Sequence, residues 1–68
     1  MANYMDIAGR IEVANELDKI TKCGEDKADR IVNAFIEGTN ELSKMREYWN
    51  AKSAKAAAKV VKKYWLDF

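Results

Sequence analysis

Apolar residues in the first third of the chain recur at the three-and-four spacing of a helix, yet they form two patches rather than one stripe. At the helical increment, the second patch is rotated from the first by roughly 100° or more. The first patch comprises Tyr4, Ile7, Ile11 and Ala14, and the second comprises Val13, Leu17 and Ile20. We therefore predict a helix over 3–23 that bends or meets two different surfaces, followed by a turn at Gly24.

The next segment has one buried face, because its apolar residues keep a single helical phase. Asp26 and Asp29 suit the positive end of a helix that begins here. This pattern predicts a second helix over 26–37. Its apolar face comprises Ala28, Ile31, Val32, Phe35 and Ile36.

The segment that starts at Gly38 leaves two all-α architectures open. Glycine costs about 1 kcal/mol inside a helix, and the two residues after it are good N-caps for a new helix. The resulting small bundle has three helical segments, over 3–23, 26–37 and 40–66. The apolar phase nevertheless continues past the glycine, since Phe35, Leu42, Trp49 and Ala56 lie seven residues apart. That continuity favours a helical hairpin with a long second arm over 26–66, and either arrangement makes 1–68 a single helical domain.

The predicted helix over 40–66 changes character along its length. Over 40–50 its inner face is narrow and comprises Leu42, Met45 and Trp49. From position 51 the apolar face widens to about two-thirds of the circumference, which is typical of a helix that packs against two neighbours. A chain this short needs further stabilisation, so we predict that a second copy supplies one neighbour in a homodimer. The predicted protein interface comprises Ala54, Ala58, Val61, Trp65 and Phe68.

Charge is divided unevenly along the chain. Residues 1–41 hold nine acidic and five basic residues, a net charge of −4, whereas residues 42–68 hold seven basic and two acidic residues, a net charge of +5. Four lysines form one stripe on the last predicted helix, here called the lysine stripe: Lys52, Lys55, Lys59 and Lys62. The stripe either complements the acidic half, within one chain or in an antiparallel dimer, or binds an external anion.

Few residues suited to catalysis or metal binding are present. The chain has no histidine and one cysteine, Cys23, which excludes the usual zinc ligands, the usual general base near neutral pH and an intrachain disulfide. The i,i+4 pairs Glu12 with Glu16 and Glu37 with Glu41 lack the histidines that accompany such pairs in di-metal bundles. We therefore expect no catalytic residue, metal site or cofactor, and we predict that the protein is not an enzyme.

Binding is the function that these exclusions leave. We predict a small helical protein that binds and modulates a protein partner as a regulator, adaptor or inhibitor. The alternative is a DNA- or RNA-binding regulator that contacts phosphates through the lysine stripe, although a net charge of only +1 weighs against it. Membrane attachment is disfavoured because alanine dominates the apolar face. With no leader pattern and one free thiol, a cytoplasmic location is expected.

Overall fold

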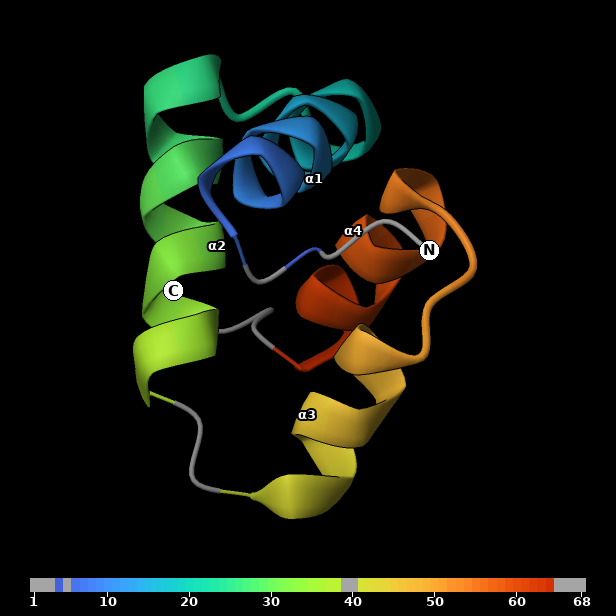
Figure 1. Cartoon of the computed structure of the whole chain (residues 1–68). Helices are drawn as coiled ribbons and strands as arrows, with labels where there is room; N and C mark the ends of the chain where they lie inside the picture. Colours follow the sequence, from blue (N-terminus) through green and yellow to red (C-terminus); the bar gives the residue numbers. More distant parts are fainter. Residues whose placement is uncertain (1–3, 5, 39–40, 65–68) are drawn as a thin grey trace.

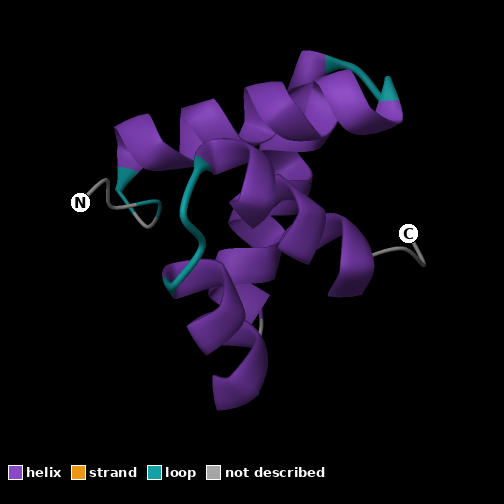
Figure 2. Ribbon diagram, turned by 90° about the vertical axis from the view of Figure 1, so that its right-hand side faces the viewer, coloured by secondary structure: helices purple, strands orange, loops and turns teal. Residues whose placement is uncertain are grey.

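The computed structural model describes residues 4, 6–38 and 41–64. These residues form helices and include no β-strand. The helices are α1 (Ile7–Thr21), α2 (Glu25–Gly38), α3 (Leu42–Trp49) and α4 (Ala54–Tyr64) (Figures 1 and 2). The predicted all-α class is confirmed for this part of the chain, and the arrangement is compatible with a small helical bundle.

Helix α1 begins later than the sequence predicted. Asp6 is its N-cap, and the Asp6 carboxylate accepts a hydrogen bond from the backbone N–H of Gly9 at 2.7 Å. At the other end Lys22 adopts a left-handed conformation with φ of 57°, and its N–H bonds to the carbonyl of Asp18 at 2.6 Å. The Asp18 side chain then accepts from the N–H of Gly24 at 2.9 Å, which closes the turn into α2.

Helix α2 follows the prediction closely. Gly24 has a φ of 98°, a backbone conformation that residues other than glycine rarely adopt, so the chain can turn sharply before Glu25. Glu25 and Asp26 lie in the first turn, where carboxylates are favoured by the helix dipole. All five residues of the predicted apolar face are buried: Ala28, Ile31, Val32, Phe35 and Ile36.

The predicted helix over 40–66 is wrong, because the chain breaks it into α3 and α4 at residues 50–53. The Ser53 hydroxyl accepts a hydrogen bond from the N–H of Ala56 at 3.1 Å and so caps the start of α4. Residues with high helix propensity surround this serine, so propensity alone does not predict the break. The hairpin arm over 26–66 is also wrong, since α2 ends at Gly38 and α3 begins at Leu42.

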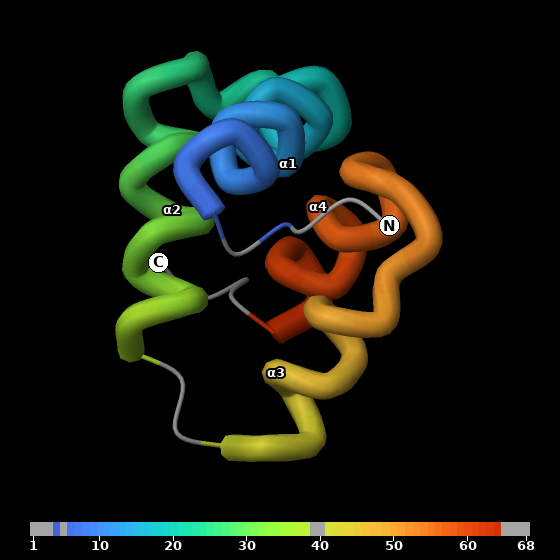
Figure 3. Tube along the Cα trace, in the orientation of Figure 1, coloured from blue at the N-terminus to red at the C-terminus, as the bar shows by residue number. Residues whose placement is uncertain are grey.

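The break allows α4 to turn back into the centre of the molecule. Helix α4 packs against α1, α3 and α2, while α1 also packs against α2. Figure 3 shows α2 along one side, α3 and α4 toward the other, and α1 above them. Buried residues of all four helices and Tyr4 form one hydrophobic core, which in the described residues contains no buried charged side chain.

Candidate functional site

Helix α3 buries a different face from the one predicted. Leu42 and Trp49, expected inside, are 64% and 63% exposed, and Met45 is only partly buried. These three residues, here called the α3 stripe, lie at positions i, i+3 and i+7 and therefore share one face of the helix. Leu42 and Trp49 make this stripe an apolar surface that the described residues leave largely uncovered, while Met45 packs partly against the core.

Tyr48 takes the buried place on α3. Its side chain is fully buried, and its ring lies 5.5 Å from that of Phe35 at a tilt of 49°. The Tyr48 hydroxyl donates a hydrogen bond of 2.7 Å to the backbone carbonyl of Tyr4. Tyr48 therefore joins α3 to α2 and to the segment before α1.

Burial also changes the chemistry of Tyr48. Desolvation raises the pKa of the Tyr48 hydroxyl well above its ordinary value, while the positive charge of Arg10 acts in the opposite direction. The hydroxyl thus remains protonated and able to donate at physiological pH. This environment makes Tyr48 a structural anchor, and its ring is inaccessible to a partner.

The interface predicted on α4 lies mostly inside the molecule. Ala58 and Val61 are fully buried, and Ala54 is partly buried against the same core. The apolar face of α4 is broad because it packs against three helices of its own chain, so it no longer requires a second copy. Trp65 and Phe68, the other two predicted interface residues, lie outside the described residues.

The lysine stripe lies on the surface. Lys55, Lys59 and Lys62 extend from α4, Lys52 precedes it, and all four are exposed. Within the part of the chain that the structure describes, none of them forms an ion pair. Their charges are therefore available to another molecule.

The basic residues beside α3 are engaged locally. Lys63 lies 3.4 Å from a Glu47 carboxylate oxygen and 4.9 Å from the centre of the Tyr64 ring. The Tyr64 hydroxyl donates to the other carboxylate oxygen of Glu47. Lys44 lies 3.4 Å from Glu41 and 5.2 Å from the Tyr64 ring centre. These contacts tie α3 to α4.

Two of the glutamates considered as metal ligands form ion pairs with basic side chains instead. Glu16 pairs with Lys19 at 3.6 Å, and Glu37 pairs with Arg10 at 3.6 Å. Among the residues described, no three His, Cys, Asp or Glu side chains are grouped to hold a metal ion. In the same residues, no helix combines the length and the hydropathy needed to cross a bilayer.

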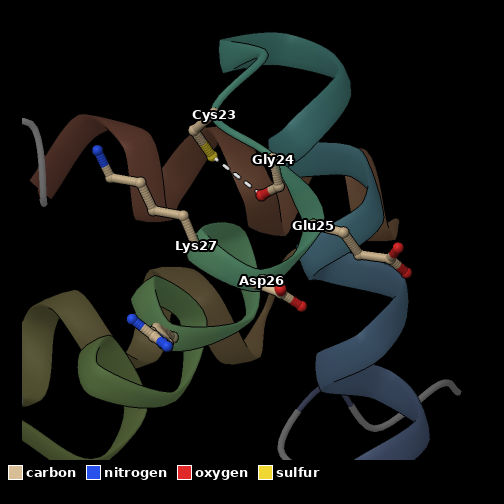
Figure 4. A pocket seen from close by; sticks show the side chains of 6 residues that line it. Cys23, Gly24, Glu25, Asp26 and Lys27 are labelled. Atoms are coloured by element: carbon tan, nitrogen blue, oxygen red, sulfur yellow. Dashed lines mark hydrogen bonds between the residues drawn. The ribbon is translucent and has the colours of Figure 1, made fainter.

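An open hollow of about 640 Å³ lies at the start of α2 (Figure 4). Cys23 is partly buried at its edge, and the Cys23 thiol donates to the carbonyl of Gly24 at 3.5 Å. Figure 4 shows Glu25 and Asp26 directed to one side and Lys27 to the other. With mixed charges and a wide mouth, the hollow presents no convergent set of groups for catalysis.

Sequence reasoning missed a second exposed apolar pair, Ile7 and Ile11 on α1. They are 80% and 49% exposed, whereas Val13 and Leu17 from the other predicted patch are buried. The signal was present in the sequence as two patches out of phase on one helix. Both patches reach the core, the second through Val13 and Leu17 and the first only through Tyr4 and Ala14.

No protein-family model, curated protein or solved structure matches this chain.

Proposed function

We propose that this protein is a non-catalytic helical module that binds and modulates a protein partner through the α3 stripe. The observation that supports this proposal is the exposure of Leu42 and Trp49 on one face of α3, at 64% and 63%. Tryptophan is enriched among the residues that dominate protein interfaces, where truncation commonly costs about 2 kcal/mol or more. An exposed tryptophan two turns from an exposed leucine is well suited to bind protein.

Charges beside the stripe indicate the chemistry of the partner. Arg46 on α3 and Lys52 after it are both exposed, and neither forms an ion pair in the described part of the chain. We expect the partner to present apolar side chains next to carboxylates, because complementary charge favours association and fixes orientation.

The proposal covers a regulator, an adaptor or an inhibitor, since each acts by occupying a surface of its partner. The homodimer expected from the sequence remains part of the proposal, although the buried residues of α4 no longer supply its interface. A cytoplasmic location likewise stays a prediction.

Site-specific photo-crosslinking tests the proposal. A photoreactive amino acid is introduced at position 49 and, as a matched control, at exposed position 27 on α2. We expect a defined protein to crosslink from position 49 in nuclease-treated lysate, to be lost when Leu42 is replaced by Asp, and to be absent from position 27. Equal crosslinking from both positions, or none from position 49, would contradict the proposal.

Nucleic-acid binding is a second candidate, favoured by the exposed and unpaired lysine stripe. Trp49 is three residues before Lys52 and exposed, so an aromatic surface for base stacking accompanies the charges. If all four lysines contact single-stranded phosphates, the logarithm of affinity should fall against the logarithm of salt with a slope of about −3.

A titration of labelled oligonucleotide separates the two candidates. Replacing the four lysines by glutamine should abolish binding and its salt dependence. The matched control neutralises four basic residues of the acidic half: Lys19, Lys22, Lys27 and Arg30. If the control weakens binding as much as the lysine-stripe variant does, the stripe is not the nucleic-acid site.

A further inference from the structure

An apolar face of α1 lies uncovered on the side away from the core residues. Ile7 and Ile11 are one helical turn apart, and they are 80% and 49% exposed. Neither belongs to the hydrophobic core of the described residues. Exposed side chains of this size at adjacent turns form a surface that a second element would cover favourably.

A hollow of about 240 Å³ continues this face toward α2. We call it the acidic hollow; it is lined by Ile11, Ala14, Asn15, Glu25, Asp26 and Asp29. Its α1 side consists of Ile11, Ala14 and the polar Asn15, and its α2 side carries three exposed carboxylates. None of these carboxylates takes part in an ion pair within the described residues.

The complementary charge is present on the same chain but is not used there. Each of the four ion pairs that the structure describes joins residues within 6–38 or within 41–64. The acidic wall of α2 and the lysine stripe of α4 therefore form no ion pair with each other within the described residues. Of the two possibilities that the sequence leaves open, neutralisation within one chain is not seen between these groups.

We propose that the acidic hollow and the Ile7–Ile11 face bind the lysine-bearing surface of α4 from a second copy of this chain. The spacing of the charges supports the match. Glu25 and Asp29 are four residues apart, as are Lys55 and Lys59, so each pair spans about 6 Å along its helix. Two parallel or antiparallel helix surfaces can thus form both ion pairs at once.

The apolar parts of the two surfaces also correspond. Ala56 and Val60 are only partly buried and lie beside the lysines of α4. Lysine stems are themselves apolar and cover neighbouring hydrophobic surface while the ammonium group stays in water. Ile7 and Ile11 would be covered by these groups when the two copies meet.

The contact joins two different patches, so it can form twice in a two-fold pair, with each hollow holding the other copy's helix, or once at each junction of a head-to-tail series. Figure 1 shows α2 along one side of the molecule and α4 nearer its middle. The association produces a closed pair only if the rotation between copies permits it, and a head-to-tail series otherwise. Both products contain the proposed contact, and sedimentation distinguishes them by size.

Charge reversal tests the contact directly. The acid-reversed variant carries Glu25→Lys and Asp29→Lys, and the lysine-reversed variant carries Lys55→Glu and Lys59→Glu. All four positions are exposed, so both variants should fold, which far-UV circular dichroism checks. In sedimentation velocity over a concentration series, each variant alone should associate about tenfold more weakly than the original chain.

Mixing the two variants is the decisive measurement. The basic hollow of the acid-reversed variant then meets the acidic stripe of the lysine-reversed variant. The original hollow of the lysine-reversed variant meets the original lysines of the acid-reversed variant, so association should return to its original strength. Raising the salt from about 0.01 M to about 1 M shortens the screening length from about 30 Å to about 3 Å and should weaken every one of these assemblies. A control with Lys19→Glu and Lys22→Glu has the net charge of the lysine-reversed variant but keeps both surfaces, so by itself it should associate as strongly as the original chain.

Three outcomes would overturn the proposal: a chain that is monomeric at every concentration and low salt, association that the reversals leave unchanged, or folded variants that fail to associate when mixed. If the chain is monomeric and a different, basic protein binds the original chain but not the acid-reversed variant, the acidic hollow is the site for that protein and not for a second copy. These variants leave Leu42, Met45 and Trp49 intact, so their behaviour is separable from partner binding through the α3 stripe.

Discussion

Tyr48 and Trp49 are neighbours in the sequence with opposite environments. The Tyr48 ring packs on Phe35, and its hydroxyl has a backbone acceptor 2.7 Å away, so burial leaves no polar group unpaired. Trp49 remains 63% exposed. A hydrophobic pattern ranks tryptophan above tyrosine as a core residue, and it contains no information about a carbonyl supplied from position 4. This is why the sequence predicted the wrong face of α3.

Tyr48→Phe removes that hydrogen bond while keeping the ring. We expect the free energy of unfolding at neutral pH to fall by about 1–2 kcal/mol, since a buried carbonyl loses its donor. Urea unfolding followed by circular dichroism measures the change. Tyr64→Phe is the matched control, because its hydroxyl bonds to the partly exposed Glu47, and its loss should be smaller.

The same substitution should change the alkaline limit of stability. Burial raises the pKa of Tyr48 in the folded protein, whereas tyrosine in the unfolded chain ionises at about pH 10. The contribution of the protonated Tyr48 hydroxyl to the free energy of unfolding is therefore fully present below about pH 10. It is lost as pH rises toward the folded pKa, by up to about 1.4 kcal/mol per pH unit. Tyr48→Phe should lack this part of the decline. Parallel stability curves for the two proteins above pH 10 would contradict the assignment.

Substitutions at exposed and buried apolar positions should destabilise the protein to different extents. Leu42→Ala removes a side chain that is 64% exposed and should cost less than about 1 kcal/mol of unfolding free energy. Val61→Ala removes a fully buried side chain and should cost about 2–3 kcal/mol. Equal losses in urea unfolding would show that α3 is packed as the sequence alone predicted.

At the scale of helices, the predictable parts of the fold are those where one periodic pattern determines one face. Helix α2 is the example, since its buried residues are the predicted ones. The break at 50–53 was not predicted, because Ala51 and the alanines after Ser53 favour a helix whether it continues or restarts. The Ser53 cap depends on α4 gaining contacts with α1, and a local pattern does not contain those contacts.

Ser53→Ala tests whether this cap holds the break. We expect a loss of about 1 kcal/mol, because the N–H of Ala56 loses its acceptor. Ser43→Ala, at an exposed position within α3, is the matched control and should be neutral or slightly stabilising. If the two substitutions have the same effect on urea unfolding, the serine at 53 does not act as a cap.

At the scale of the whole molecule, three surfaces are exposed: the α3 stripe, the lysine stripe that begins beside it at Lys52, and the acidic hollow next to Ile11. The candidate site could not be read from the sequence because exposure, not composition, distinguishes these surfaces from the core. Ala58 and Val61 looked like an interface until α4 was placed at the centre. Ile7 and Leu42 looked like core residues until the phases of α1 and α3 were fixed.

The separation of these surfaces predicts a double dissociation between two assays. Leu42→Asp should abolish protein crosslinking from position 49 and leave self-association unchanged, since position 42 lies outside the acidic hollow and the lysine stripe. The acid-reversed variant should weaken self-association by about tenfold and leave the crosslink intact. Leu42, Glu25 and Asp29 are all exposed, so loss of folding should not explain either result. Thermal unfolding of each variant checks this. If one substitution disables both assays while the protein stays folded, the two proposed contacts share a surface, and the assignment of separate roles to α1–α2 and α3 is wrong.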